Sequence, residues 1–192
     1  MDTVYLSKLK KKARKEGAII VYIDEAHFRQ TPTLYRTWAP LHTQPKIPTK
    51  GVRNTQKLFG AVQLEGGRFI YKHQEEYFNY ETYISFLEGD LLPAFSRTKH
   101  RIYLIQDNAG YHKKHETYEW FKSNRKYIEV FNLPPYFPEL NAVERIWNYT
   151  RKNCTHNRYF ETKEILCESL FSTFKDVQEY PDKIIGLLTP FF

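Results

Sequence analysis

Two short runs of this sequence are apolar on both of the faces that a β-strand presents, and each leads directly into an aspartate. The first is Ala18 to Asp24, and the second is Arg101 to Gln106, followed by Asp107. A strand that is apolar on both faces has to be covered on both faces, as central strands are when helices pack above and below a sheet. This feature predicts an α/β domain with two buried central strands, each closed by an aspartate.

The rest of the chain supplies further strand and helix patterns. The Glu-Gly-Gly segment 65–67 separates two strand-like runs and predicts a hairpin, because glycine adopts the positive φ that such turns need. Asn79 is expected to cap a helix that runs to Pro93, and 25–50, with its four prolines, is expected to be a long loop. The remaining predicted elements are a helix at 113–123, a strand at 127–131, a helix through Val143, Ile146, Trp147 and Thr150, and one or two helices at 161–188. This order predicts one α/β domain over 18–192, with a five-stranded mixed sheet flanked by helices.

The chain is basic, with a net charge of +7 and a pI near 9.2, which favours a polyanionic partner such as nucleic acid. Part of this charge lies in residues 1–17, which we interpret as a basic linker or helix ahead of the domain. Such a run is commonly a solvated helix face, and a contact with DNA phosphates is the functional alternative. The cations proposed for that contact are Lys10, Lys11, Lys12 and Arg14.

Cellular location is predicted from two absences in the sequence. No stretch approaches the roughly 18–20 apolar residues that a membrane-spanning helix needs. Cys154 and Cys167 are too few for a disulfide framework and too widely spaced for a paired metal site. We therefore expect a cytoplasmic protein with no membrane partner.

Three acidic residues occupy positions where a carboxylate is unfavourable: Asp24, Asp107, and Glu144 at the edge of a helix's apolar side. Taken singly, each is better explained as a turn, cap or solvated residue. If the strands are neighbours and the helix crosses them, the three carboxylates meet, and a divalent cation would relieve their repulsion. Oxygen ligands favour Mg²⁺, or Mn²⁺ in its place, over zinc. Two such ions about 4 Å apart can promote phosphodiester displacement.

Three stretches resemble the catalytic domains of DDE transposases of the Tc/mariner superfamily, particularly its bacterial insertion-sequence branch. They are 21–28 (VYIDEAHF), 104–112 (LIQDNAGYH) and 133–147 (LPPYFPELNAVERIW), in the expected order. The third stretch departs from the family pattern at Ala142, where proline is common, and at Phe137, where a small polar residue is common. Neither departure falls on an acidic residue, so we expect changed loop packing with the chemistry retained.

The resemblance implies a ribonuclease H-like fold and a catalytic triad of Asp24, Asp107 and Glu144 that binds two metal ions. It also implies DNA cleavage at transposon ends, strand transfer into target DNA, and a homodimer in the active complex. Family members carry a helix-turn-helix DNA-binding region ahead of the catalytic domain, which we expect to be a separate region here. Glu25 is expected to point to the opposite sheet face from Asp24 and is left out of the triad.

Several residues near the second acid are candidates for DNA contact. Asn108, Tyr111 and His112 follow Asp107 closely enough to reach a substrate phosphate. For Asn108 and Tyr111, a role in the core or in a turn fits equally well. His112 and His115 have the spacing of a metal pair, but no other zinc ligands accompany them, so an exposed helix start explains them better.

Other candidates lie elsewhere in the chain. Trp38, in the proline-interrupted loop, is an aromatic residue of the kind that stacks on a base. Asn148 and Arg151 fall on the same helical side as Glu144, one and two turns on. Arg151 is expected to contact a DNA phosphate, with an ion pair to an acid as the alternative.

Two other functions are compatible with the sequence. The chain could be a non-catalytic binding or assembly module that complements another subunit, or a stand-alone ribonuclease H-like nuclease. Salt-dependent DNA binding without cleavage would indicate the first, and preference for hybrid or branched substrates would indicate the second.

Overall fold

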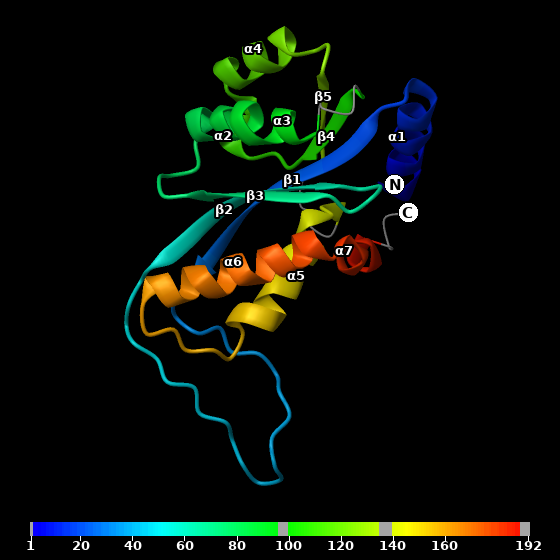
Figure 1. Cartoon of the computed structure of the whole chain (residues 1–192). Coiled ribbons are helices and arrows are strands. Elements are labelled where there is room, and N and C mark those ends of the chain that lie inside the picture. The colour runs from blue at the N-terminus through cyan, green and yellow to red at the C-terminus, as the bar shows by residue number, and fades with distance from the viewer. Residues whose placement is uncertain (1, 96–99, 135–139, 189–192) are drawn as a thin grey trace.

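Five strands form one mixed sheet in the order β3-β2-β1-β4-β5 (Figure 1). The computed structural model describes residues 2–95, 100–134 and 140–188, with side chains from residue 6 onward. β1 pairs antiparallel with β2 and parallel with β4, so the first two apolar runs are neighbours, as expected. β2 pairs antiparallel with β3, and β4 pairs parallel with β5. The strands are β1 (Ile19–Arg29), β2 (Thr55–Gln63), β3 (Phe69–Gln74), β4 (Ile102–Gln106) and β5 (Ile128–Asn132).

Helices cover both faces of this sheet, which confirms the predicted α/β class (Figure 1). On one face lie α2 (Tyr80–Phe86), the π-helical turn η1 (Leu87–Leu91), α3 (Leu92–Phe95) and α4 (His115–Ser123). The other face packs against α1 (Asp2–Glu16), α5 (Val143–Thr150), α6 (Lys163–Glu179) and α7 (Pro181–Leu188). The 3₁₀ turn η3 (Gly110–Lys113) precedes α4, and the π-helical turn η5 (Arg151–Thr155) extends α5. The two hydrophobic cores are therefore separated by the sheet.

β1 changes character along its length. Its inner half, Ile20–Ile23, is buried on both faces, as the sequence predicts for a central strand. In its outer half Ala26 and Phe28 are buried while His27 and Arg29 are exposed. The prediction that Asp24 closes this strand is wrong, because Asp24 lies in its middle. The polar–apolar alternation that follows is the period of a strand covered on one face, and a search for doubly apolar runs misses it.

The predicted turns and caps are largely confirmed. Gly66 and Gly67 have φ of 90° and 64° in the β2–β3 turn. Asn79 caps α2 through a capping box with Thr82. The helix does not stop at Pro93, because the π-helical turn before it is followed by the short helix α3. The segment 135–139, which contains Phe137, lies outside the described residues.

Residues 31–54 form a long excursion between β1 and β2, which we call the arm. Figure 1 shows it projecting away from the sheet and the helices. Its base is fastened to the segment after α5: Thr33 hydrogen-bonds His156 at 2.8 Å, and Tyr35 exchanges two hydrogen bonds with Asn157. Trp38, further along the arm, is 99% exposed.

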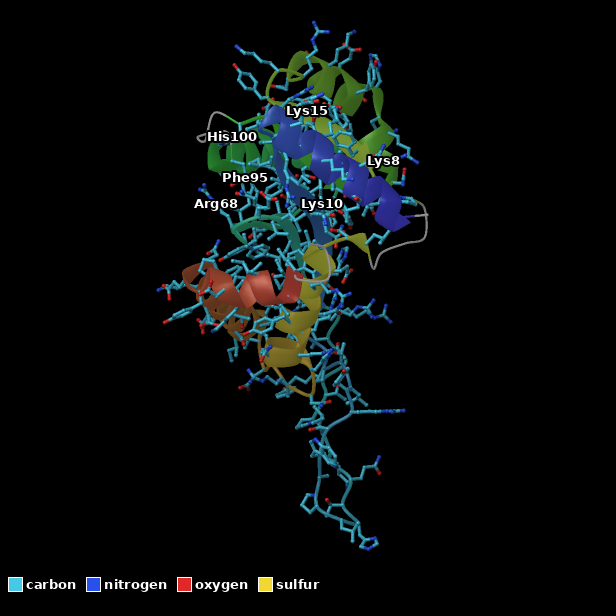
Figure 2. The ribbon with its side chains drawn as sticks, turned by 90° about the vertical axis from the view of Figure 1, so that its right-hand side faces the viewer. Lys8, Lys10, Lys15, Arg68, Phe95 and His100 are labelled. Carbon is cyan, nitrogen blue, oxygen red and sulfur yellow. The ribbon has the colours of Figure 1, made fainter. Side chains whose placement is uncertain are left out.

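α1 packs on the molecule at the end opposite the arm (Figures 1 and 2). Leu9 and Ala13 are buried in the same core as α5 and α6, while Lys8 and Lys15, labelled in Figure 2, are exposed. The helix end is held by His100, whose Nδ1 lies 2.6 Å from the carbonyl oxygen of Gly17. Among the described residues no helix combines the length and the apolar character needed to cross a bilayer.

Candidate active site

The parallel register of β1 and β4 brings two of the predicted acids to the same level of the sheet. Tyr22 pairs with Ile105, so Asp24 and Asp107 are each two residues further along their own strands. β4 ends at Gln106, so Asp107 is the first residue of the loop that follows. The middle of β1 and the end of β4 therefore bring both carboxylates to the same level of the sheet.

Asp24 lies in a crowded and partly buried environment on the face covered by α5. The indole Nε1 of Trp147 donates a hydrogen bond of 3.0 Å to its Oδ2. Burial raises the pKa of Asp24 well above its usual value, and the negative charges of Glu25, Glu144 and Asp107 raise it further. The pKa of Asp24 therefore responds to the charges of three neighbouring carboxylates.

The start of α5 is fastened directly to β1 beside Asp24. Asn141 donates from Nδ2 to the carbonyl oxygen of Ile23 at 3.1 Å, and its Oδ1 accepts from the backbone N–H of Val143 at 3.2 Å. Gly60 of β2 is the cross-strand partner of Asp24. A Cβ on Gly60 would lie 2.4 Å from the Trp147 ring, so the indole occupies the space that a side chain would need.

Glu144 lies in the first turn of α5, with its side chain about one-third exposed. Arg151 approaches it from two turns along the helix, with Nη1 3.4 Å from Glu144 Oε2. The same Nη1 is 3.4 Å from Asn148 Oδ1, so these three residues share one side of the helix, as predicted. In this structure Arg151 pairs with an acid, which was the alternative to a DNA contact.

A second group of side chains forms at the loop after β4. Ligand-type atoms of Glu25, Asp107 and His112 all lie within 4.8 Å of one another, and this is the only such group of three among the described residues. His112 Nδ1 is 3.1 Å from Asp107 Oδ1, and its Nε2 is 3.5 Å from Glu25 Oε1. Asp24 and Glu144 are not in this group. Sequence reasoning therefore missed Glu25 as a member of the site.

The opposite charges in this group stabilise one another's ionised forms. Burial alone would lower the pKa of His112, but its contacts with Asp107 and Glu25 outweigh burial and raise the pKa to about 9. In return, the hydrogen bond from His112 holds the pKa of Asp107 below its usual value despite partial burial. The imidazolium thus lies between two carboxylates, and the ring of Tyr83 packs against it with centroids 4.5 Å apart.

Asn108 and Tyr111, which were candidates for DNA contact, instead contact other residues of the protein. Asp107 Oδ1 accepts from the N–H of Ala109 at 2.9 Å, which shapes a tight turn. Asn108 donates to the carbonyl oxygen of Leu133 at 2.5 Å, and the Tyr111 ring lies against Tyr83. The expectation of an exposed helix start is correct for His115 and wrong for His112, which is 7% exposed. Burial follows from its position between the two acids, which the spacing in the sequence does not reveal.

The predicted DNA contacts of the N-terminal segment and the arm lie away from these acids. Lys12 and Arg14 on α1 pair with Glu129 at 2.8 Å and Glu65 at 3.6 Å, and Lys11 is exposed. Trp38 is at the other end of the molecule. Their roles on DNA stay predictions.

Comparison with known proteins agrees with this arrangement. The sequence profile of the DDE superfamily endonuclease family matches residues 19–167, which include every acid described above. The chain belongs to this family. As a DDE-type endonuclease chain it has the fold that its sequence motifs predicted, and its resemblance to this family is confirmed.

Individual proteins that resemble this endonuclease-family chain share between 17% and 27% of its residues in the three comparisons that follow. A 39 kDa protein of insertion element IS630 from Shigella sonnei is 27% identical over 165 residues, covering 86% of the chain and 45% of that relative. The chain thus spans about half the length of this curated relative. The solved Mos1 mariner paired-end complex with Mg has a TM-score of 0.65 and 20% identity, over 98% of the chain and 57% of that one. The solved Mos1 catalytic domain has a TM-score of 0.56 and 17% identity, over 96% and 88%. These structures share the ribonuclease H-like fold.

Proposed function

We propose that this chain is the catalytic domain of a transposase, which cleaves DNA strands at transposon ends and joins them to target DNA with the help of divalent cations. The observation that supports the proposal is the crowding of carboxylates around Asp24 in a family-like sequence setting. A stability role does not explain it, because three like charges raise the pKa of Asp24, while the one hydrogen-bond donor to its side chain in the described part of the chain is the neutral indole of Trp147.

The acidic residues fit a site for Mg²⁺ or Mn²⁺. Asp24, Asp107 and Glu144 offer only oxygen ligands, which these ions prefer. Within the described residues, a buried oxygen of Glu25, Oε1, accepts no hydrogen bond and faces His112 Nε2 at 3.5 Å, a position suited to a cationic partner. We propose that the first three residues hold a pair of ions, with Glu25 beside them. The bound ions would polarise the phosphodiester and lower the pKa of the attacking hydroxyl.

The protein's own side chains then have distinct tasks around these acids. Trp147 fixes the orientation of Asp24 through its hydrogen bond, and Asn141 fixes the start of the helix that carries Glu144. His112 holds the Asp107 carboxylate in place through its contact at 3.1 Å. Arg151 is placed to exchange Glu144 for a DNA phosphate when substrate arrives.

The partners follow from the same proposal. We propose that the DNA partners are transposon terminal inverted repeats and target DNA, handled in the cytoplasm at the nucleoid. Solved structures of Mos1 include a paired-end complex with the left transposon end and a strand transfer complex, and by analogy we propose that this chain acts as a homodimer on two ends. A separate N-terminal helix-turn-helix region is proposed to recognise the ends.

The test is a nicking assay on transposon-end DNA with Mn²⁺ or Mg²⁺. We expect nicking that EDTA abolishes and that each of Asp24→Asn, Asp107→Asn and Glu144→Gln lowers by about 10³-fold. The matched control is Asp182→Asn, since Asp182 is an exposed acid on α7 and is not part of the cluster. Full activity in Asp107→Asn would refute the proposal. Salt-dependent DNA binding without nicking, where a longer chain cuts, would favour the assembly module.

A further inference from the structure

A polar cavity of about 420 Å³ lies at the foot of the arm, where β1 ends and β2 begins. None of the described residues that line it is acidic. Its lining includes two arginines and four side chains that can donate hydrogen bonds: Arg29, Arg53, Thr31, Thr33, Asn54 and Thr55. The composition suits an anionic ligand with several oxygen acceptors.

Neither arginine has its charge neutralised. Arg29 and Arg53 are both exposed, and neither makes an ion pair or a side-chain hydrogen bond within the described ranges 2–95, 100–134 and 140–188. By contrast, Lys12, Lys72 and Arg101 each lie within 3 Å of a carboxylate oxygen. Each guanidinium carries forked N–H donors of the kind that bind a phosphate through two hydrogen bonds.

The walls of the cavity are held in place by a buried amide. Gln30, 4% exposed, donates from Nε2 to the carbonyl oxygens of Phe160 and Glu161, each at 3.0 Å. Its Oε1 accepts a hydrogen bond from Asn54 Nδ2 at 2.9 Å, which joins the end of β1 to the start of β2. Thr31 adds a 2.8 Å hydrogen bond to the carbonyl oxygen of Val52. These hydrogen bonds fix the backbone that carries the two arginines, even though the arm beyond them is extended.

The cavity lies in line with the proposed active site. Arg29 is five residues beyond Asp24 on β1, roughly 17 Å along the strand. It alternates onto the same sheet face as Glu25, and Figure 1 shows that this end of the β1–β2 ribbon extends past the α2–α4 layer. Each strand of a DNA duplex carries one phosphate per 3.4 Å of axis, so this distance corresponds to roughly five base pairs.

We propose that this cavity binds the backbone phosphates of duplex DNA about five base pairs from the cleaved bond, with Arg29 and Arg53 as the phosphate ligands. The choice of DNA as partner rests on the proposed function. The site is separate from the acidic cluster, and its role is to fix the direction of the duplex.

The experiment measures binding of a labelled duplex in EDTA, so that cleavage does not interfere, over a series of salt concentrations. Arg29→Ala/Arg53→Ala should bind about tenfold more weakly, and its salt slope should fall by about 2, because two phosphate contacts are lost. Arg29→Lys/Arg53→Lys keeps the charge and should retain most of the slope. The control that removes equal charge elsewhere is Lys175→Ala/Lys183→Ala on α6 and α7, and thermal melting of each variant confirms folding.

The outcomes separate this inference from the proposed function. Weaker duplex binding in the arginine variant supports the inference even if the wild-type chain nicks no DNA, a result that would refute only the proposed function. An unchanged salt slope, or an equal loss in the lysine control, would overturn the inference. Competition by inorganic phosphate that depends on both arginines while duplex binding does not would show a small-anion site and would also overturn it.

Discussion

Asp24 and Glu25 are neighbours in the sequence but belong to different regions of the molecule. Asp24 faces α5, where an indole N–H is its hydrogen-bond donor and like charges surround it. Glu25 faces the α2–α4 side, where a buried histidine lies 3.5 Å from it. Asp107, at the end of the neighbouring strand, interacts with both sides, and the charge of Glu25 also raises the pKa of Asp24 across the strand.

This difference separates two ways of tolerating a carboxylate. On the Glu25 side the protein itself supplies the positive charge, because His112 has a raised pKa and lies between two acids. On the Asp24 side the described residues close to the carboxylate supply no matching cation, apart from Arg151, which pairs with Glu144. A residue without a counter-ion from the protein is the better candidate for a metal ligand, which is why we propose Asp24, on the α5 side, as a ligand.

The largest expected effect comes from replacing one carboxylate oxygen with an amide nitrogen, in Asp24 on one side and in Glu25 on the other. Asp24→Asn should lower nicking about 10³-fold, because a cation ligand contributes several kcal/mol to transition-state stabilisation. Glu25→Gln should lower it by only about tenfold, because its direct partner is His112. Parallel time courses at saturating Mn²⁺ measure both. Equal losses would mean that the two acids serve the same ion, and the comparison would then be wrong.

The next effect tests the packing that orients Asp24. Gly60→Ala places a Cβ against Trp147, and overpacking of this kind lowers the free energy of unfolding by about 1–3 kcal/mol. The melting temperature should fall by roughly 2–10 °C for a chain of this size. Gly89→Ala, whose Cβ would meet nothing within 4 Å, serves as the control and should melt at or slightly above the wild-type temperature. An unchanged Gly60→Ala melt would show that the indole can move aside freely.

A smaller effect is expected on the other side of the sheet. His112→Ala leaves Glu25 and Asp107 facing each other without a cation, which should destabilise the protein by about 1–2 kcal/mol in EDTA, since Asp107 is half-exposed. Added Mn²⁺ should restore more of the melting temperature in this variant than in the wild type, because the ion can replace the imidazolium. A loss of stability that no cation reduces would show that His112 acts by packing alone.

The smallest expected effect on stability is at Trp38, which belongs to neither side. Its side chain is 99% exposed, so Trp38→Ala should change the free energy of unfolding by no more than about 0.5 kcal/mol. If the arm stacks on bases, duplex or single-strand binding should weaken by about 1–3 kcal/mol. Titrations of both DNA forms, with chemical denaturation alongside, separate these effects. Unaltered binding to both would remove Trp38 from the DNA surface.

Much of the fold was predictable from local patterns. The doubly apolar runs became the adjacent central strands β1 and β4, the glycine pair became the β2–β3 turn, and Val143, Ile146, Trp147 and Thr150 are all buried on α5. The extension of β1 to Arg29 was missed because only its inner half has the doubly apolar pattern. Glu25 was set aside on the correct argument of alternation, yet the loop that carries His112 and Asp107 reaches its face of the sheet.

The amino-acid sequence by itself determined which side chains alternate along each strand, where the turns fall, and which acids lie at awkward positions, because these depend on periodicity within a few residues. Only the tertiary structure decided which groups meet. The parallel pairing of β1 with β4, the crossing of α5 beside Gly60, and the loop that inserts His112 between two acids join segments about 80 or more residues apart. Such contacts depend on how whole elements pack, and no local pattern specifies them.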